Sequence, residues 1–305
     1  MYDLIIIGGG PAGVAAGVYA ARKKIKVALI ADSFGGQSLV SADVRNWIGT
    51  KSVSGLDLAN MLEGHLRDQE DIDIISPTLV EKITKIDVGF KLFTNDKKEL
   101  DTKTVLVTTG SHRRKLKVPG ESEFDGKGVV YCSTCDAPIF KDKTVAVVGG
   151  GNAGLEAVVD ALPYANKIYL LVRSDKLKGD PITQDKIKNN SKVEIIFQAE
   201  VSEILGDNFV TGLKYQDTAT DQAKDLKLEG VFVEIGAVPN ADFTKDLVNL
   251  SDYGEILVDH KTQRSSQLGI WAAGDVSDVI YKQNNISAGD AIKAVLNIYD
   301  YLNKL

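Results

Sequence analysis

One pattern occurs twice in this chain and limits the folds that it can adopt. A short apolar segment, a turn of the form G-x-G-x-x-G, an alanine-rich stretch and a second apolar segment follow one another in residues 2–32 and again in residues 143–173. Each copy predicts a strand, a helix and a second, parallel strand. The glycines of the two turns are Gly8, Gly10 and Gly13 in the first copy, and Gly149, Gly151 and Gly154 in the second.

Glycines at this spacing suit the binding of a dinucleotide. The first permits a tight turn, the second lets the backbone approach a pyrophosphate, and the third lets the helix pack closely on the strand. Two ordinary glycine-rich turns are the alternative, which the repeated strand and helix context disfavours. Two such sites predict a flavin dinucleotide and a nicotinamide dinucleotide in one protein, or a duplication with one inactive copy.

The size and charge of the chain narrow the classes of function. Its 305 residues favour two domains, because single cores of that size are unusual. A net charge of −6 argues against nucleic acid as the main partner. No signal peptide and no bilayer-spanning apolar run stands out, so we expect a cytoplasmic protein that does not bind membranes.

Both cysteines lie in one stretch, "YCSTCDAP", in which Cys132 and Cys135 are followed by Asp136. Half of a zinc site is one interpretation, but two cysteines and three histidines without ligand spacing do not supply four ligands, so we expect no metal. An inert buried pair is another. A redox-active pair is favoured, because two intervening residues allow a small disulfide ring that opens readily.

The remaining segments have simpler patterns. Residues 80–110 alternate like an antiparallel hairpin. Residues 201–217 and 228–240 are expected to form a parallel set of strands in the second half of the chain. Residues 290–305 have the apolar spacing of a final helix.

Seven motifs, taken in order, resemble the low-molecular-weight thioredoxin reductases. They are "GGGPAG", "GGQ", "TTG", C-x-x-C-D, "GGGNAG", "GAVPN" and "AAGD". The chain is also similar to the disulfide-reductase part of the alkyl hydroperoxide reductase flavoprotein. The resemblance covers essentially the whole chain. It implies an α/β fold of two Rossmann-like nucleotide-binding domains of the pyridine nucleotide-disulfide oxidoreductase type, the second inserted in the first.

The resemblance also implies a division of labour and a homodimer. Residues 1–113 and 240–305 would form a discontinuous FAD-binding domain, and residues 114–239 an NAD(P)H-binding domain that carries the C-x-x-C. The residues that would contact FAD are Gly8, Gly10, Pro11, Ala12, Gly13, Gly35, Gly36, Gln37, Asn46, Thr109, Gly110, Gly274, Asp275 and Gln283. Those that would contact the nicotinamide coenzyme are Gly149, Gly151, Asn152, Ala153, Gly154 and Arg173. A turn-capping aspartate at 275 and a loop asparagine at 46 are the structural alternatives.

Roles for the C-x-x-C-D motif follow from the same resemblance. Cys135 would lie against the flavin, Cys132 would attack the disulfide of a partner, and Asp136 would shuttle the proton for the departing thiolate. An N-cap aspartate is the alternative role at 136. Ala137 departs from the family, which usually has glycine there, so the local backbone geometry needs testing.

The choice of coenzyme should depend on the end of the second strand in the inserted domain. An acid there binds the 2′-hydroxyl of NAD, whereas an arginine accommodates the 2′-phosphate of NADP. The chain has Val-Arg-Ser at this point, with Arg173, where NADPH-specific reductases typically have His-Arg-Arg. We predict NADPH over NADH, and a degenerate nicotinamide site is a third possibility.

Together these features predict a thioredoxin-disulfide reductase-like oxidoreductase. Electrons would pass from NAD(P)H through FAD and the Cys132–Cys135 disulfide to a small thioredoxin-like or glutaredoxin-like protein, or to a carrier of a peroxiredoxin system. A separate carrier is expected because the sequence begins just before its first strand. The rivals are a dithiol oxidase, a nicotinamide-independent flavin disulfide reductase, and a flavin-bound partner-binding protein without turnover.

Overall fold

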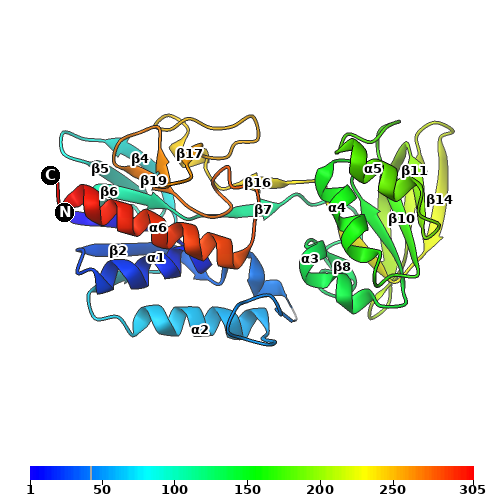
Figure 1. Ribbon diagram of the computed structural model, residues 1–305, viewed down its shortest axis with the longest axis horizontal. Helices are drawn as coiled ribbons and strands as arrows, with labels where there is room; N and C mark the ends of the chain where they lie inside the picture. The colour runs from blue at the N-terminus through cyan, green and yellow to red at the C-terminus, as the bar shows by residue number, and fades with distance from the viewer. Residues whose placement is uncertain (42) are drawn as a thin grey trace. The chain divides into compact units, whose positions relative to one another are not determined.

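The chain folds into two units in the computed structural model, which describes residues 1–41 and 43–305 (Figure 1). Unit 1 comprises Met1–His112 and Val238–Leu305, and unit 2 comprises Arg113–Ala237. Unit 2 is thus inserted into the sequence of unit 1, and the chain crosses between the units twice. The crossings are the paired strands β7 (Ser111–Arg113) and β16 (Ala237–Pro239).

Unit 1 is built around a sheet with a parallel centre. In spatial order its strands are β17 (Val258–Asp259), β18 (Arg264–Ser265), β19 (Ile270–Ala272), β6 (Glu99–Val107), β1 (Tyr2–Gly9), β2 (Val27–Phe34) and β3 (Ile72–Ile75). The antiparallel hairpin of β4 (Val80–Lys85) and β5 (Phe90–Thr94) pairs with β6, which confirms the hairpin expected for this segment. The central strands of the sheet in unit 1 are buried on both faces, and their sequences are continuously apolar for that reason.

Helices cover one face of this sheet. They are α1 (Pro11–Arg22), α2 (Gly55–Arg67) and α6 (Asn284–Leu302), and α1 and α6 lie side by side in Figure 1. The alternation along β1 divides the core, since Leu4 and Ile6 pack with the helices while Ile5 and Ile7 pack on the opposite side with β4 and β5. The final helix begins six residues before the predicted start.

Unit 2 has a second parallel sheet with different cover on its two faces. The strands, in spatial order, are β11 (Val193–Phe197), β10 (Lys167–Val172), β9 (Thr144–Val148), β15 (Gly230–Val233) and β8 (Val129–Val130). The helices α4 (Asn152–Ala161) and α5 (Pro181–Lys188) pack on one face. A sheet of β12 (Ala199–Gly206), β13 (Val210–Asp217) and β14 (Gln222–Lys227) packs on the other.

The expectation that residues 201–217 join the parallel set is wrong. They form the antiparallel pair β12 and β13 instead. Only residues 207–209 separate the two strands, and a connection this short can join antiparallel strands but not parallel ones.

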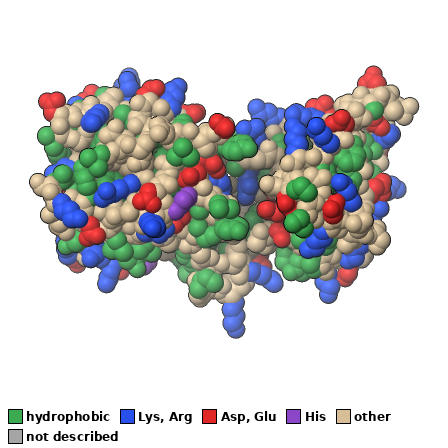
Figure 2. Space-filling view, turned by 45° about the horizontal axis from the view of Figure 1, so that its top comes forward, with side chains coloured by type: hydrophobic (Ala, Val, Ile, Leu, Met, Phe, Trp, Pro, Cys, Tyr) green, Lys and Arg blue, Asp and Glu red, His purple; other side chains and the backbone are tan. Residues whose placement is uncertain are grey.

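Two further features of the molecule are the charges on its surface and the apolar character of its helices. Acidic and basic side chains are both spread over each unit on the face shown in Figure 2. Within the described part of the chain, no helix is both long enough and apolar enough to cross a bilayer. Short 3₁₀ helices lie outside the main layers: η1 (Gly36–Val40), η2 (Ala137–Phe140) and η3 (Asp242–Thr244).

Candidate functional site

The first glycine-rich turn joins β1 to α1 with no room for side chains. Gly8 has φ +120°, and a Cβ there would lie 2.4 Å from the carbonyl oxygen of Thr108. A Cβ on Gly13 would lie 1.8 Å from the carbonyl oxygen of Gly8. Helix α1 therefore packs directly on the end of β1, and only glycine fits at both positions.

The amino end of α1 is open to an anion. Gly10 is its N-cap and Pro11 its first residue, and no described side chain caps the helix or places an acid in its first turn. A Cβ on Gly10 would meet only the Cα of Gly36, at 3.9 Å. The amide of Gly35 donates to the carbonyl of Gly9 at 3.1 Å, which holds the next turn beside the first. Backbone N–H groups and the helix dipole therefore favour a phosphate here.

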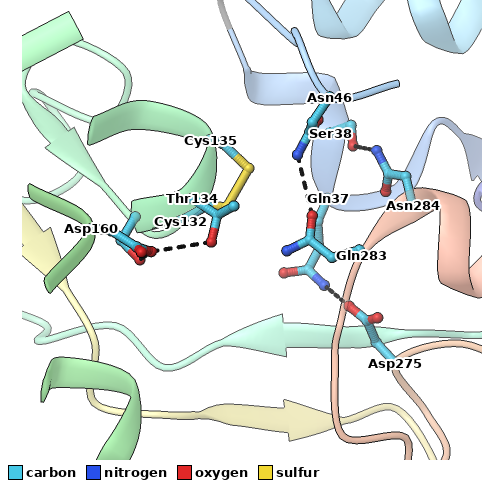
Figure 3. Close-up of a disulfide and its surroundings, with 11 residues drawn as sticks. Gln37, Ser38, Asn46, Cys132, Thr134, Cys135, Asp160, Asp275, Gln283 and Asn284 are labelled. Carbon is cyan, nitrogen blue, oxygen red and sulfur yellow. Dashed lines mark hydrogen bonds between the residues drawn. A yellow bond between two sulfur atoms is a disulfide. The ribbon is translucent and has the colours of Figure 1, made fainter. Parts of the chain in front are cut away.

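Polar side chains from distant segments of unit 1 meet beside this turn (Figure 3). Gln37 Nε2 donates to Asp275 Oδ2 at 3.1 Å, and Asn46 Nδ2 donates to Gln283 Oε1 at 3.2 Å. These hydrogen bonds join η1 and the loop after it to the segment between β19 and α6. Residues separated by more than 230 positions in sequence thus form one polar lining in unit 1.

Two more turns complete this end of unit 1. Gly274 has φ +78°, and a Cβ there would lie 3.4 Å from the Cβ of Ala12, so the turn after β19 lies against α1. Gly110 has φ +64° with open space at its Cβ position, and Thr109 Oγ1 donates to the carbonyl of Asn240 at 2.6 Å. The residues assigned to FAD are therefore gathered at the carboxyl ends of the parallel strands, and their contact with the cofactor stays a prediction.

The second glycine-rich turn, between β9 and α4 of unit 2, repeats this geometry. Gly149 has φ +140°, and a Cβ there would lie 2.2 Å from the carbonyl oxygen of Glu234. A Cβ on Gly154 would lie 2.0 Å from the carbonyl oxygen of Gly149. Gly151 is the N-cap of α4, with open space at its Cβ position, and Ala153 in the first turn is exposed. The turn fits a second pyrophosphate.

The loop after β10 folds back onto this second turn. The Lys178 amide donates to the carbonyl of Gly150 at 2.8 Å, and the Asp180 amide donates to Asn152 Oδ1 at 2.7 Å. Arg173 follows β10 directly and is exposed. These contacts hold the segment between residues 173 and 180 at the edge of the turn.

Cys132 and Cys135 form a disulfide in unit 2, with their Cα atoms 5.4 Å apart (Figure 3). Cys135 lies in the single helical turn α3 (Ser133–Asp136), and Cys132 is the N-cap of that turn. Burial raises the pKa of Asp136 to about 6, a value suited to proton transfer near neutral pH. Ala137 has φ −52° and ψ −38°, which any L-residue adopts, so alanine replaces the family's glycine without strain.

The residue before the disulfide is anchored by a buried carboxylate. Tyr131 donates its hydroxyl hydrogen to Glu121 Oε1 at 3.1 Å. Glu121, only 1% exposed, also accepts the backbone N–H groups of Leu116 and Lys117 at 2.8 and 2.7 Å. Lys115 Nζ lies 4.3 Å from the centre of the Tyr131 ring. The segment that leads into the disulfide is therefore fixed to the segment that enters unit 2.

The carboxylate of Asp160 bonds the turn between the cysteines, and a second acid, Glu234, is buried in the same unit. Asp160 Oδ2, from α4, accepts the hydroxyl group of Ser133 at 2.8 Å. It also accepts that of Thr134 at 3.2 Å (Figure 3). Glu234 follows β15 directly and is 8% exposed, and the backbone N–H of Ser133 favours its ionised form. Burial raises the pKa of Glu234 to about 7, although Arg113 acts in the opposite direction.

Sequence reasoning missed Asp160, Glu234 and Asp32. Nothing in the sequence singles out Asp160, which lies on a helix far from the cysteines along the chain. Glu234 interrupts the apolar run "VFVEIG", and a charge inside a buried strand pattern is a usable signal. Asp32 is exposed in β2, 24 positions after Gly8, which matches the position of Arg173 after Gly149. An acid near this distance is the expected ligand of a ribose hydroxyl.

The zinc interpretation has no geometric support in what the structure describes. Across residues 1–41 and 43–305, no group of three or more histidine, cysteine, aspartate or glutamate side chains is arranged to hold a metal ion.

Comparison with known proteins gives matches along nearly the whole chain. A family model described as pyridine nucleotide-disulphide oxidoreductase matches residues 2–291. The crystal structure of thioredoxin reductase from Streptococcus pyogenes MGAS5005 is similar, with 34% identity, a TM-score of 0.92, and coverage of 100% of this chain and 99% of that one. Thioredoxin reductase from Giardia duodenalis also has a TM-score of 0.92, at 29% identity, with coverage of 100% and 99% of the two chains.

Curated relatives include longer proteins. An alkyl hydroperoxide reductase subunit of Staphylococcus aureus (strain MRSA252) is 40% identical over 301 residues, which are 99% of this chain and 59% of the relative. The corresponding subunit of Pseudomonas putida is 42% identical over 304 residues, 99% of this chain and 58% of the relative. The chain thus spans a little under two thirds of the length of these relatives.

Proposed function

The chain belongs to the pyridine nucleotide-disulphide oxidoreductase family, and from that premise we propose that it is an FAD-dependent, NAD(P)H-linked disulfide reductase of the thioredoxin reductase type. Members of this family use FAD and NAD(P)H. The observation that carries the proposal is the disulfide on α3, which is bonded through Ser133 to α4, the helix that begins at the second dinucleotide turn. The disulfide and the second glycine-rich turn are therefore parts of one compact unit.

The residues of the first turn fit FAD on structural grounds. Gly10 and Gly36 leave backbone-lined space at the uncapped end of α1, and Gln37 and Asp275 add polar groups beside it. Bound FAD supplies two-electron transfer between a reduced nicotinamide and a disulfide. The residues that would hold it are Gly8, Gly10, Pro11, Ala12, Gly13, Gly35, Gly36, Gln37, Asn46, Thr109, Gly110, Gly274, Asp275 and Gln283.

The second turn would hold the nicotinamide coenzyme, and NADPH is the preferred form. Gly149, Gly151, Asn152, Ala153 and Gly154 would surround its pyrophosphate. Arg173, exposed at the end of β10, would bond the 2′-phosphate through a charge-assisted hydrogen bond. No acid occupies the strand end, so nothing there repels a phosphate.

The two thiols and Asp136 would divide the work of disulfide exchange. The Cys132 thiolate attacks one sulfur of the partner's disulfide, and the other sulfur leaves as a thiolate. Cys135 then attacks Cys132, which restores the internal disulfide and releases the partner as a dithiol. Because its pKa is raised to about 6, a fraction of the Asp136 carboxyl groups would be protonated near neutral pH, and this group would give its proton to the departing thiolate.

The partner would be a small carrier with its own disulfide, of the thioredoxin-like, glutaredoxin-like or peroxiredoxin-system kind. The names of the similar proteins, thioredoxin reductase and alkyl hydroperoxide reductase, support that class. We infer a homodimer in the cytoplasm, by analogy with the same relatives.

Anaerobic stopped-flow reduction of the flavin tests this function. Rapid bleaching by NADPH, and slower bleaching by NADH, is the expected result. Bleaching only by dithiols, with oxygen consumed in air, would establish a dithiol oxidase instead. Bleaching by no reductant would leave a flavin-bound binding protein.

A further inference from the structure

The two residues between the cysteines are both bonded to one carboxylate. Asp160 Oδ2, on α4, accepts the Ser133 hydroxyl at 2.8 Å and the Thr134 hydroxyl at 3.2 Å (Figure 3). Ser133 is 8% exposed, so its bond to Asp160 is shielded from water, whereas Thr134 is exposed. One oxygen atom of α4 therefore holds the whole segment that separates Cys132 from Cys135.

The segments on either side of this turn are fixed by other contacts. Before it, the Tyr131 hydroxyl donates to Glu121 Oε1 at 3.1 Å. After it, Ala137 and Phe140 are buried in the hydrophobic core between α4 and the sheet of unit 2. The bonds to Asp160 therefore act on the middle of the turn, between two fixed ends.

The turn needs these bonds most when the disulfide is open. In the oxidised pair, the sulfur–sulfur bond closes a small ring and itself restricts the backbone. The helix α3 has only four residues, and the Asp136 N–H donates to the carbonyl of Cys132 at 3.0 Å. A single helical turn is unfavourable by itself, because ordering its residues costs more than its hydrogen bond returns. In the reduced pair, the bonds to Asp160 offset this cost.

We propose that Asp160 is a positioning residue of the Cys132–Cys135 pair, which keeps the reduced turn in the shape that closes into the disulfide. The proposal deepens the disulfide reductase function and rests on it. Asp160 acts through the hydroxyl groups of Ser133 and Thr134 and takes no part in the exchange itself. An ordered turn raises the effective concentration of one thiol beside the other, and this favours the disulfide.

The step that benefits from this order is the release of the partner. When a mixed disulfide joins Cys132 to the partner, the Cys135 thiolate attacks the Cys132 sulfur. The bond between the two cysteines forms as the bond to the partner breaks, and the partner's sulfur leaves with the electron pair as a thiolate, which takes a proton. The exchange needs no further oxidant or reductant.

The equilibrium between the pair and glutathione tests the proposal in the flavin-loaded full chain, without oxygen. Glutathione disulfide oxidises the dithiol to the disulfide and becomes two molecules of glutathione, and alkylation with mass spectrometry measures the free thiols. Asp160→Ala should lower the equilibrium constant for disulfide formation by roughly tenfold, because the freedom gained by the turn stabilises only the dithiol. An unchanged constant would overturn the proposal.

A conservative variant separates the acceptor from the charge. Asp160→Asn keeps an oxygen acceptor in the same place, so its equilibrium constant should stay within about threefold of wild type. A constant as low as that of Asp160→Ala would mean that the charge matters rather than the bonds to the turn, and would contradict the proposal.

Removal of the two donors should reproduce the removal of the acceptor. The double variant Ser133→Ala, Thr134→Val lacks both hydroxyl groups and should show the same roughly tenfold fall. Adding Asp160→Ala to it should change the constant little, because all three substitutions remove the same bonds. Effects that add up in the triple variant would show that Asp160 acts by another route, and the proposal would fail.

A second hydroxyl–carboxylate bond in unit 2 supplies a matched control. Asp180 is the N-cap of α5 and accepts the Thr183 hydroxyl at 2.9 Å. Asp180→Ala removes a bond of the same kind on another helix, so it should leave the equilibrium with glutathione unchanged. An equal fall in this variant would indicate a general loosening of unit 2 and would overturn the proposal. The measurement uses neither NAD(P)H nor a carrier protein, so failure of the coenzyme reaction would refute the reductase function without changing these results.

Discussion

The two glycine-rich turns are near copies in backbone and differ in the side chains beside them. Gly8 and Gly149 both have positive φ, and a Cβ on either would strike a carbonyl oxygen, that of Thr108 or of Glu234. The amide of Thr108 donates to the carbonyl of Ile7, and that of Glu234 to the carbonyl of Val148. Ile7 and Val148 directly precede Gly8 and Gly149, so Thr108 and Glu234 occupy equivalent places. In unit 1 that place holds Thr108, whose hydroxyl donates to the carbonyl of Ile7, whereas in unit 2 it holds the buried acid Glu234.

A second pair of equivalent positions differs in charge. Asp32 stands where Arg173 stands in the other unit, 24 residues after the first glycine of each turn. The backbone geometry of a phosphate-binding turn therefore occurs twice, and we propose that single side chains at the strand ends give each copy its own ligand. The following predictions test this separation.

The largest effect should come from the disulfide, which only the second turn has beside it. Cys132→Ser and Cys135→Ser should each reduce thioredoxin-type disulfides at background rate, because the exchange needs both thiols. Flavin bleaching by NADPH should persist in both variants, since it needs only the two turns. Ser133→Ala, between them, is the control and should remain active. A wild-type rate in either cysteine variant would show that the pair is not the relay.

The third glycine of each turn should affect only its own unit. A Cβ on Gly13 or Gly154 would lie 1.8 or 2.0 Å from backbone oxygen, so alanine should cost several kcal/mol, roughly 3 or more. Gly13→Ala should lose FAD, whereas Gly154→Ala should keep FAD and bind the coenzyme much more weakly, as measured by flavin content and by titration. Gly64→Ala is the control, because Gly64 lies in α2 with open space at its Cβ position and alanine favours helix. Loss of FAD in Gly154→Ala would contradict the separation.

The third prediction compares how the free energy of unfolding depends on pH in Glu234→Gln and in Thr108→Val. The pKa of Glu234 is raised to about 7 in the folded chain. The contribution of this group to the free energy of unfolding is therefore complete below its pKa in the unfolded chain, and it is lost as pH rises through about 7. Relative to wild type, Glu234→Gln should therefore gain up to about 3 kcal/mol between about pH 4.5 and pH 8, whereas Thr108→Val should show no such slope. Denaturant unfolding at several pH values measures both. Parallel pH profiles for wild type and Glu234→Gln would contradict this account.

The smallest effect should concern the choice of coenzyme. Arg173→Ala should raise the KM for NADPH by about 10- to 100-fold, the value of a charge-assisted phosphate contact of roughly 1.5–3 kcal/mol, and should change the KM for NADH little. Lys176→Ala, an exposed lysine in the same loop, is the control and should have a minor effect. Equal changes for both coenzymes would mean that the 2′-phosphate is not bound by Arg173.

Local patterns were sufficient to predict the repeated strand–turn–helix units. Each unit depends on apolar runs and on glycines that are required for steric reasons, and all of these residues are close together in the sequence. The parallel assignment of residues 201–217 failed because strand direction depends on the connection, and the three residues at 207–209 permit only an antiparallel pair. The start of α6 was missed because its first residues, "NNIS", are polar and poor helix formers.

The site could be predicted only where its reactive residues lie within one sequence motif. The cysteines and Asp136 are adjacent in sequence, so their association could be seen without a structure. Asp160 bonds Ser133 through space, across 27 positions, and no local pattern encodes such a contact. The charges of Asp136 and Asp160 act on the pKa of Glu234, and both residues are also far from it in the sequence. The place of Asp160 beside the disulfide is a consequence of how α4 packs in unit 2.

The central claim is that electrons from a nicotinamide coenzyme reach the Cys132–Cys135 disulfide. The most direct measurement adds NADPH to the oxidised holoprotein without oxygen, traps free thiols with an alkylating reagent, and locates them by peptide mass spectrometry. The account predicts that Cys132 and Cys135 both become alkylated, and that alkylation moves to an oxidised thioredoxin-type carrier when one is added in excess. A disulfide that stays intact with NADPH and with NADH, yet opens with dithiothreitol, would contradict it.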